Sequence, residues 1–241
     1  MATTLILVGW SAAAQTTTSL SVTPTTNATP SLTKEPNEEA WSFSASVNTY
    51  IVPDGDDYAQ PTITADRSWL HLEARYNYEA VKTGSMWVGY NFAGNERLAW
   101  TFTPMLGGVF GDINGIAPGY KGSLSWWNLQ FYSEGECVFD IGDLSDSFLY
   151  NWSELTFTPV DWFRFGFVMQ RTRAYEADRE IQRGLLVGFS WASKNSKTVD
   201  LTTYVFDLDE SKPTVVVAVT LSFLAEGLRR HRDRIFRRPH R

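Results

Sequence analysis

Residues 41–48, Trp-Ser-Phe-Ser-Ala-Ser-Val-Asn, decide the fold class, because apolar and polar side chains alternate along them. Successive side chains of a β-strand point to opposite faces, so this alternation predicts a strand with one apolar and one polar face. Thr49 and Ile51 continue the apolar parity, whereas Tyr50 and Val52 fall on the polar one. We attribute this lapse to a β-bulge or to the end of the membrane span near a loop.

The same alternation recurs as far as residue 223, most clearly in segments 70–79, 163–170, 184–191 and 215–223. Two kinds of connection take turns along the chain: longer and often acidic loops, and tight turns near 67–68, 94–96, 127–128, 160–161 and 194–196. This plan predicts an all-β fold, a transmembrane antiparallel up-and-down β-barrel of about twelve strands over residues 41–223. Segment 59–66 has the weakest pattern, and a ten-strand barrel is the alternative if it merges with its neighbour.

Composition supports a membrane barrel. The chain has 10 Trp, 10 Tyr and 15 Phe, a net charge of −6 and a mean hydropathy of −0.23. These values exclude a bundle of membrane helices and, for most of the chain, intrinsic disorder. A soluble β-sandwich also alternates, with its apolar face inside. A barrel is favoured because the apolar face is aromatic near the strand ends, the polar face is small or charged, and the last strand ends in Phe223.

Several stretches resemble a group of bacterial outer-membrane barrel proteins of porin-like type. The resemblance rests on TADRSWLHLEARYNYEA at 64–80, TGSMWVGYNF at 83–92, TPMLGGVFG at 103–111 and NGIAPG at 114–119, and it continues through 162–175 and 181–190. It implies an outer-membrane barrel in a Gram-negative bacterium and no particular activity, because the group has no established one. The basic tail departs from the group, whose barrels end at the terminal aromatic residue.

The two ends differ from the barrel in composition. Residues 1–14 are interpreted as a signal peptide, because an apolar stretch precedes Ala12-Ala13-Ala14, although a basic start is missing. Residues 15–40 are rich in Thr, Ser and Pro and predict a disordered linker. Residues 224–241 carry seven Arg against two acidic residues and form a basic C-terminal tail. Such a tail either binds anionic lipid headgroups or is a solvated extension; no nucleic-acid partner is expected.

Strand parity places a set of charged side chains in the barrel lumen, where they must be hydrated or paired. The predicted lumen-lining charged residues are Asp66, His71, Glu73, Arg75, Glu79, Arg97, Glu134, Glu136, Glu154, Arg164 and Asp200. The acidic members outnumber the Arg members seven to three, which favours cations over anions in an open lumen. The sequence therefore predicts a passive, weakly cation-selective pore for small solutes. A structural barrel plugged by salt bridges is the alternative.

One pair of carboxylates suggests a sharper hypothesis. If loop 141–147 is centred on its hairpin, Glu134 lies directly opposite Glu154. Two carboxylates at cross-strand distance either recruit a cation or are neutralised by a base, for which Arg164 on the next strand is the candidate.

An outer-membrane hydrolase is a further alternative. His71 is the one histidine of the predicted barrel, it points inward near Thr64 and Asp66, and Ser68 is a candidate nucleophile. No hydrolase or metalloprotease motif accompanies it, so no catalytic residue is assigned. With one cysteine, Cys137, on the lipid-facing parity, and no metal or nucleotide motif, no metal or cofactor is expected.

The expected partners follow from location. They are outer-membrane lipid, small solutes, and the barrel assembly machinery, which would read the final strand ending at Phe223. The glycines at 107, 108 and 111 are expected to relieve strand curvature or to make room for a bulky lumenal neighbour.

Overall fold

The computed structural model describes residues 41–53, 55–95, 98–142, 147–174, 180–193, 197–209 and 213–224. The predicted signal peptide 1–14, the linker 15–40 and almost all of the basic tail 224–241 lie outside these residues and stay predictions. Within the described ranges no helix is long and apolar enough to cross a membrane.

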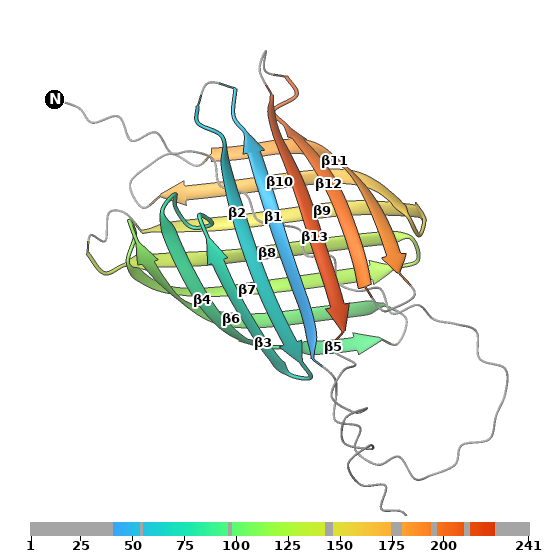
Figure 1. Cartoon of the computed structure of the whole chain (residues 1–241), viewed down its shortest axis with the longest axis horizontal. Coiled ribbons are helices and arrows are strands. Elements are labelled where there is room, and N and C mark those ends of the chain that lie inside the picture. The colour runs from blue at the N-terminus through green and yellow to red at the C-terminus, as the bar shows by residue number, and fades with distance from the viewer. Residues whose placement is uncertain are drawn as a thin grey trace, which may run out of the picture.

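Antiparallel strands follow one another around a single sheet that closes on itself (Figure 1). The strands are β1 Ser42–Ile51, β2 Tyr58–Arg67, β3 Leu70–Tyr76, β4 Thr83–Tyr90, β5 Phe92–Asn95, β6 Ala99–Gly111, β7 Gly115–Trp126, β8 Leu129–Asp140, β9 Phe148–Val160, β10 Phe163–Ala174, β11 Glu180–Ser193, β12 Lys197–Phe206 and β13 Thr214–Leu224.

Closure comes from β1, which pairs with β2 on one side and with β13 on the other. Both β4 and β5 pair with β6, in one continuous register, so together they make a single strand of the wall. The barrel therefore has twelve strands, as the alternation predicts. The weak segment 59–66 forms β2, which pairs along its length with β1, so the ten-strand alternative is not realised.

The interruption between β4 and β5 falls at Asn91. Pro104 of β6 lies between the residues that pair with β4 and those that pair with β5, and proline has no backbone N–H to donate to a ladder. Asn91 is held by other bonds: its backbone N–H donates to the carbonyl of Trp69 (2.7 Å), and its side-chain amide donates to Asp66 (2.9 Å).

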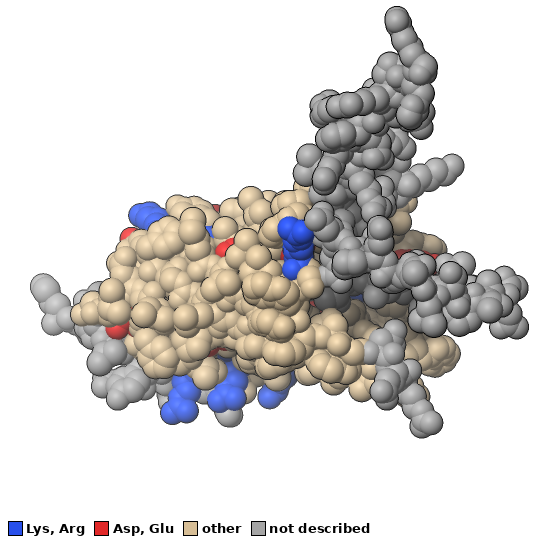
Figure 2. Space-filling view, turned by 90° about the horizontal axis from the view of Figure 1, so that it is seen from below, with Lys and Arg blue, Asp and Glu red and all other residues tan. Residues whose placement is uncertain are grey.

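The outer face of the barrel is apolar. Outward side chains of alternate strand positions are strongly exposed, including Met86 and Phe167, each 66% exposed, and Ile63, 59% exposed. Figure 2 shows one side of the molecule, most of which consists of residues other than Lys, Arg, Asp and Glu. Aromatic pairs such as Trp69–Tyr90 and Phe43–Phe223, both with ring centroids 5.4 Å apart, lie at the end that carries the tight turns. This is the arrangement of an interfacial aromatic girdle.

Aromatic side chains also fill the lumen toward the end that carries the longer loops. The Trp152 ring packs against Tyr204 (5.2 Å) and Phe206 (5.5 Å), and Tyr50 stacks on Tyr58 (4.6 Å). β1 keeps a regular register with both neighbours up to Tyr50, so the expected bulge is absent. Tyr50 breaks the apolar parity because it belongs to this interior cluster, in which it is 1% exposed.

Candidate functional site: the charged lumen

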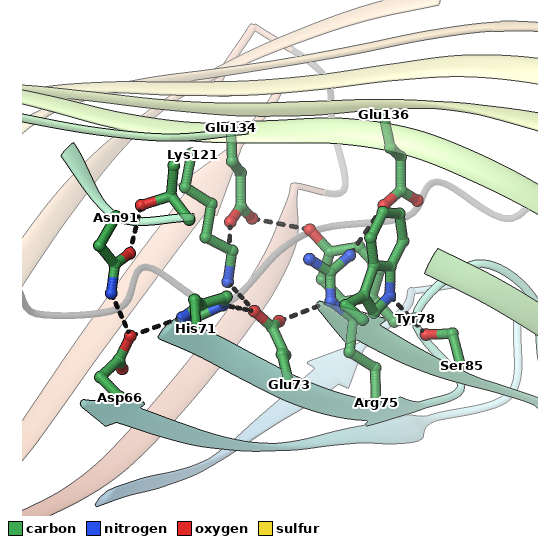
Figure 3. Close-up of polar contacts among 12 residues, drawn as sticks. Asp66, His71, Glu73, Arg75, Tyr78, Ser85, Asn91, Lys121, Glu134 and Glu136 are labelled. Carbon is green, nitrogen blue, oxygen red and sulfur yellow. Dashed lines mark hydrogen bonds and ion pairs between the residues drawn. The ribbon is translucent and has the colours of Figure 1, made fainter. Parts of the chain in front are cut away.

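The main cluster of charged side chains lies inside the barrel, where side chains of β2 and β3 meet those of β7 and β8 (Figure 3). Residues 71, 73 and 75 are alternate positions of β3, so their side chains share the inward face. All three are at most 6% exposed. Charged groups this deeply buried need partners, and the structure supplies them.

His71 lies between two carboxylates. Its Nδ1 is 2.7 Å from Asp66, which is its directly opposite partner across the tight turn, and its Nε2 is 3.0 Å from Glu73. A histidine that activates a serine must present one ring nitrogen to the hydroxyl. Here carboxylates occupy both nitrogens, so the geometry gives the hydrolase alternative, with Ser68 as its nucleophile, no support.

Arg75 is the centre of the acidic group. Its guanidinium donates to Glu73 (2.5 Å) and to Glu136 (2.7 Å), and it lies 3.8 Å from Glu79. The cation also sits over aromatic rings, 4.1 Å from the centroid of Tyr78 and 4.5 Å from that of Trp87. Three carboxylates and two aromatic faces around one planar guanidinium suit its fork of donors.

Glu79 lies in the connection between β3 and β4 and is fully buried. It accepts hydrogen bonds from the Ser85 hydroxyl (2.5 Å) and the Trp87 indole (3.3 Å). Burial raises the pKa of the Glu79 carboxyl above its ordinary value, while the nearby Arg75 opposes this rise.

Lys121 of β7 belongs to the same cluster and is absent from the sequence-based set. It forms an ion pair with Glu73 and lies 3.7 Å from Glu134, its opposite partner on β8. Strand parity could have identified Lys121 as inward-facing, because it shares one buried face with Ala117 and Ser123. The glycines and the proline around it weaken the alternation there, which hides this parity.

The predicted facing of Glu134 and Glu154 is wrong. Glu134 lies opposite Trp152, and Glu154 lies opposite Tyr132. The hairpin between β8 and β9 is not centred on loop 141–147, so the register is two residues away from the symmetrical one. Each carboxylate has its own donors: Glu134 accepts from the hydroxyls of Tyr78 (2.7 Å) and Tyr132 (2.6 Å), and Glu154 accepts from the Trp152 indole (2.8 Å).

A second ion pair lies on the wall of β10 to β12. Arg164 binds Asp200 through two nitrogens, at 2.6 and 2.7 Å, rather than neutralising Glu134 and Glu154 as the hypothesis offered. Ser190 donates to the same carboxylate (2.5 Å), and Gly188 leaves room for the guanidinium stem. Removing one partner of a buried pair of this kind costs about 3–5 kcal/mol, because the other charge stays behind unpaired.

The structure thus places ten of the eleven predicted lumen residues on the inner side of the wall, with Asp66 half-buried near the turns. The remaining one, Arg97, lies outside the described residues. Side chains fill much of the space between: among Arg75, Tyr78, Trp87, Glu134 and Tyr150 they leave no room for a water molecule. Among the described side chains, no group of three or more His, Cys, Asp or Glu is arranged to hold a metal ion.

Comparison with known proteins adds information about the fold. No protein family matches the chain, and no curated protein matches it either. Among solved structures, the KdgM porin has a TM-score of 0.50 at 10% identity over 75% of this chain and 98% of that one. The NanC porin has a TM-score of 0.50 at 12% identity over the same shares. A further similar structure is the KdgM porin in complex with disordered oligogalacturonate. At these identities the likeness shows that this chain has the fold of a porin barrel.

Proposed function

We propose that this chain is a bacterial outer-membrane barrel that passes small solutes passively and weakly prefers cations. The observation that carries the proposal is the inverted polarity of the closed wall, apolar and aromatic outside and charged inside. In lipid every backbone polar group must be bonded within the protein, which a closed barrel achieves. A barrel with an apolar exterior and a polar lumen suits a membrane, whereas a water-soluble barrel has the opposite arrangement.

The proposed preference for cations rests on the charges of the described lumen. With Asp140, which shares the inward face of β8 with Glu134 and Glu136, eight carboxylates face three Arg and Lys side chains, and a lumen with such a surplus attracts cations and repels anions. The basic groups are Arg75, Lys121 and Arg164. An acidic oligosaccharide such as the one named with the KdgM porin is therefore not the solute class we propose for this lumen.

Single-channel conductance of the refolded 241-residue chain in a planar bilayer tests the proposal, with the reversal potential measured in a salt gradient. We expect small, stable steps and a reversal potential of cation-selective sign. Glu154 is the most informative residue, because no basic group lies within 4 Å of it in the described part of the barrel. Glu154→Gln should therefore shift the reversal potential toward zero.

Thr156→Val provides the matched control, because Thr156 is the next inward residue of β9 and carries no charge. It should leave the reversal potential where the unaltered chain has it. An equal reversal potential in Glu154→Gln and Thr156→Val would remove the lumenal carboxylates as the source of selectivity. An anion-selective unaltered chain would contradict the preference altogether.

A structural barrel with a filled lumen is the second candidate. It is favoured by the near-complete burial of the inward side chains, of which Trp152 and Tyr204 have no exposed surface. Stiff, interdigitated side chains leave no continuous water path unless some of them move. Absence of conductance from a barrel shown to be folded would decide for this second candidate and against the pore.

A further inference from the structure

The inner wall formed by β1 and β2 carries polar groups that have no hydrogen-bond partner among the described residues. Both amide atoms of Asn48 and both of Gln60 are unpaired, as are the hydroxyls of Thr62 and Tyr50. Asn48 and Gln60 lie directly opposite each other in the ladder, and each is 1% exposed. These atoms therefore form one patch, which we name the amide patch.

Buried polar groups in folded proteins are nearly always paired, with protein or with ordered molecules. The contrast inside this barrel is strong, since Glu73, Arg75 and Asp200 each make two or more polar contacts. Of the ten unpaired side-chain atoms among the described residues, six lie together on this wall, and the other four are single atoms of Glu79, Glu136, Arg171 and Tyr204. This distribution indicates that the amide patch is completed by something other than the protein.

The unpaired atoms define the chemistry of that missing partner. Each amide offers an NH₂ donor and a carbonyl acceptor. A cation would satisfy the carbonyl oxygens and leave the NH₂ groups of Asn48 and Gln60 unpaired, and an anion would do the reverse. A hydroxyl both donates and accepts, so it matches either half of an amide. The partner that fits is neutral and hydroxylated.

The surroundings of the amide patch agree with this chemistry. The neighbouring inward residues of β1, β2 and β13, which are Ser46, Thr64, Ala218 and Thr220, are uncharged and buried, and the charged cluster begins on β3, where Arg75 lies opposite Thr62. Tyr50 and Tyr58 stack on each other with ring planes 4° apart on the side toward the loops, so the patch has an aromatic boundary there. Asn48 is three residues from the end of β1, which places the patch roughly 10 Å below the loop end.

We propose that Asn48 and Gln60, on the inner face of β1 and β2, form a binding subsite for a neutral hydroxylated solute, which is a polyol or an uncharged sugar. This deepens the proposed function, on which it rests for the solute's route, by naming a solute class and the residues that receive it. The Tyr50–Tyr58 pair lies between the subsite and the loops, so a solute entering from the loop side meets these rings first.

Saturation-transfer difference NMR on the folded 241-residue chain in detergent micelles tests the subsite, with xylitol as the neutral probe and glutarate as a charged probe of similar size. We expect transfer to xylitol and at least fivefold less to glutarate. Asn48→Leu combined with Gln60→Met, which keeps the side-chain sizes, should reduce transfer to xylitol at least fivefold. Thr156→Val should not reduce it, because the Thr156 hydroxyl already donates to the carbonyl of Gln130.

Several outcomes would overturn the subsite. The first is no transfer to xylitol from the folded unaltered chain, which would mean that only ordered water occupies the patch. The second is transfer to xylitol from the double variant equal to that from the unaltered chain. If the double variant does not fold, as judged by heat-dependent gel migration, Gln60→Met alone must show the reduction. Because binding is measured without conduction, a barrel that binds xylitol but passes no current would contradict the pore and leave the subsite standing.

Discussion

At the scale of single residues, the large Trp87 ring fits into the lumen because the residues next to it, Gly107 and Gly119, are glycines. A Cβ on Gly107 of β6 would overlap the Trp87 ring, and one on Gly119 of β7 would come within 3.0 Å of it. Trp87 in turn lies against Arg75 and donates its indole N–H to Ser85 (2.9 Å). The expectation that Gly107 makes room for a bulky lumenal neighbour is therefore met, and the charged cluster depends on this room.

Gly107→Ala should lower the free energy of unfolding by about 1–3 kcal/mol, the usual cost of forcing extra volume into a packed interior. Gly108→Ala is the matched control, because no atom lies within 4 Å of the position of its Cβ. It should stay within about 0.5 kcal/mol of the unaltered chain, as surface substitutions usually do. Urea unfolding in lipid vesicles measures both. Equal stabilities would show that the Trp87 ring moves aside at no cost.

At the scale of strands, the sequence predicts which face of the wall a side chain points to better than it predicts which residue lies opposite it on the next strand. Period-two alternation assigns each side chain to the inner or outer face, and this parity was sufficient to identify the twelve strands of the wall and most of the ionic lumen residues, although not Lys121. It says nothing about which residue lies opposite, since a shift of two residues preserves every facing. The Glu134–Glu154 pairing was wrong for this reason.

Other features escaped because they depend on contacts between distant strands. Lys121 pairs with Glu73, which is 48 residues away in the chain, and Arg164 pairs with Asp200 across β11. The interruption at Asn91 depends on Pro104 in the neighbouring strand. Tyr50 breaks parity because aromatic residues of β9 and β12 also fill the loop end of the lumen. The sequence of one strand does not indicate which residues of distant strands will contact it.

The register of the β8–β9 hairpin can be measured directly by cysteine cross-linking. In a Cys137→Ser background, Phe131→Cys with Leu155→Cys should form a disulfide readily, because these outward residues are direct partners. Phe131→Cys with Phe157→Cys should form it at least tenfold more slowly, since a diagonal pair lies about 7–8 Å apart. The symmetrical register would reverse this order, so faster oxidation of the second pair would contradict the structure.

At the scale of the whole molecule, closure makes the last strand as important as the first. β13 has to find β1 before either strand has two neighbours, and the residues that pair at the start of this seam, Ser42 and Leu224, are 182 positions apart in the chain. Contacts so far apart in sequence form late and slowly, because the intervening chain must first be ordered. Phe223 sits where this seam begins, stacked on Phe43 and 42% exposed on the outer face.

Phe223→Ala should therefore impair assembly more than stability. In cells we expect a several-fold drop in the amount of folded barrel recovered from the outer membrane, because the terminal aromatic is proposed to be read by the assembly machinery. Leu221→Ala is the control, as Leu221 is 48% exposed on the same face of β13 and lies two residues away. It should be recovered at close to the normal level. Refolded from urea into detergent, both variants should form the barrel, since each removes only lipid-facing surface. A loss of refolding in Phe223→Ala alone would instead assign Phe223 to the closure of the seam, through its stacking on Phe43.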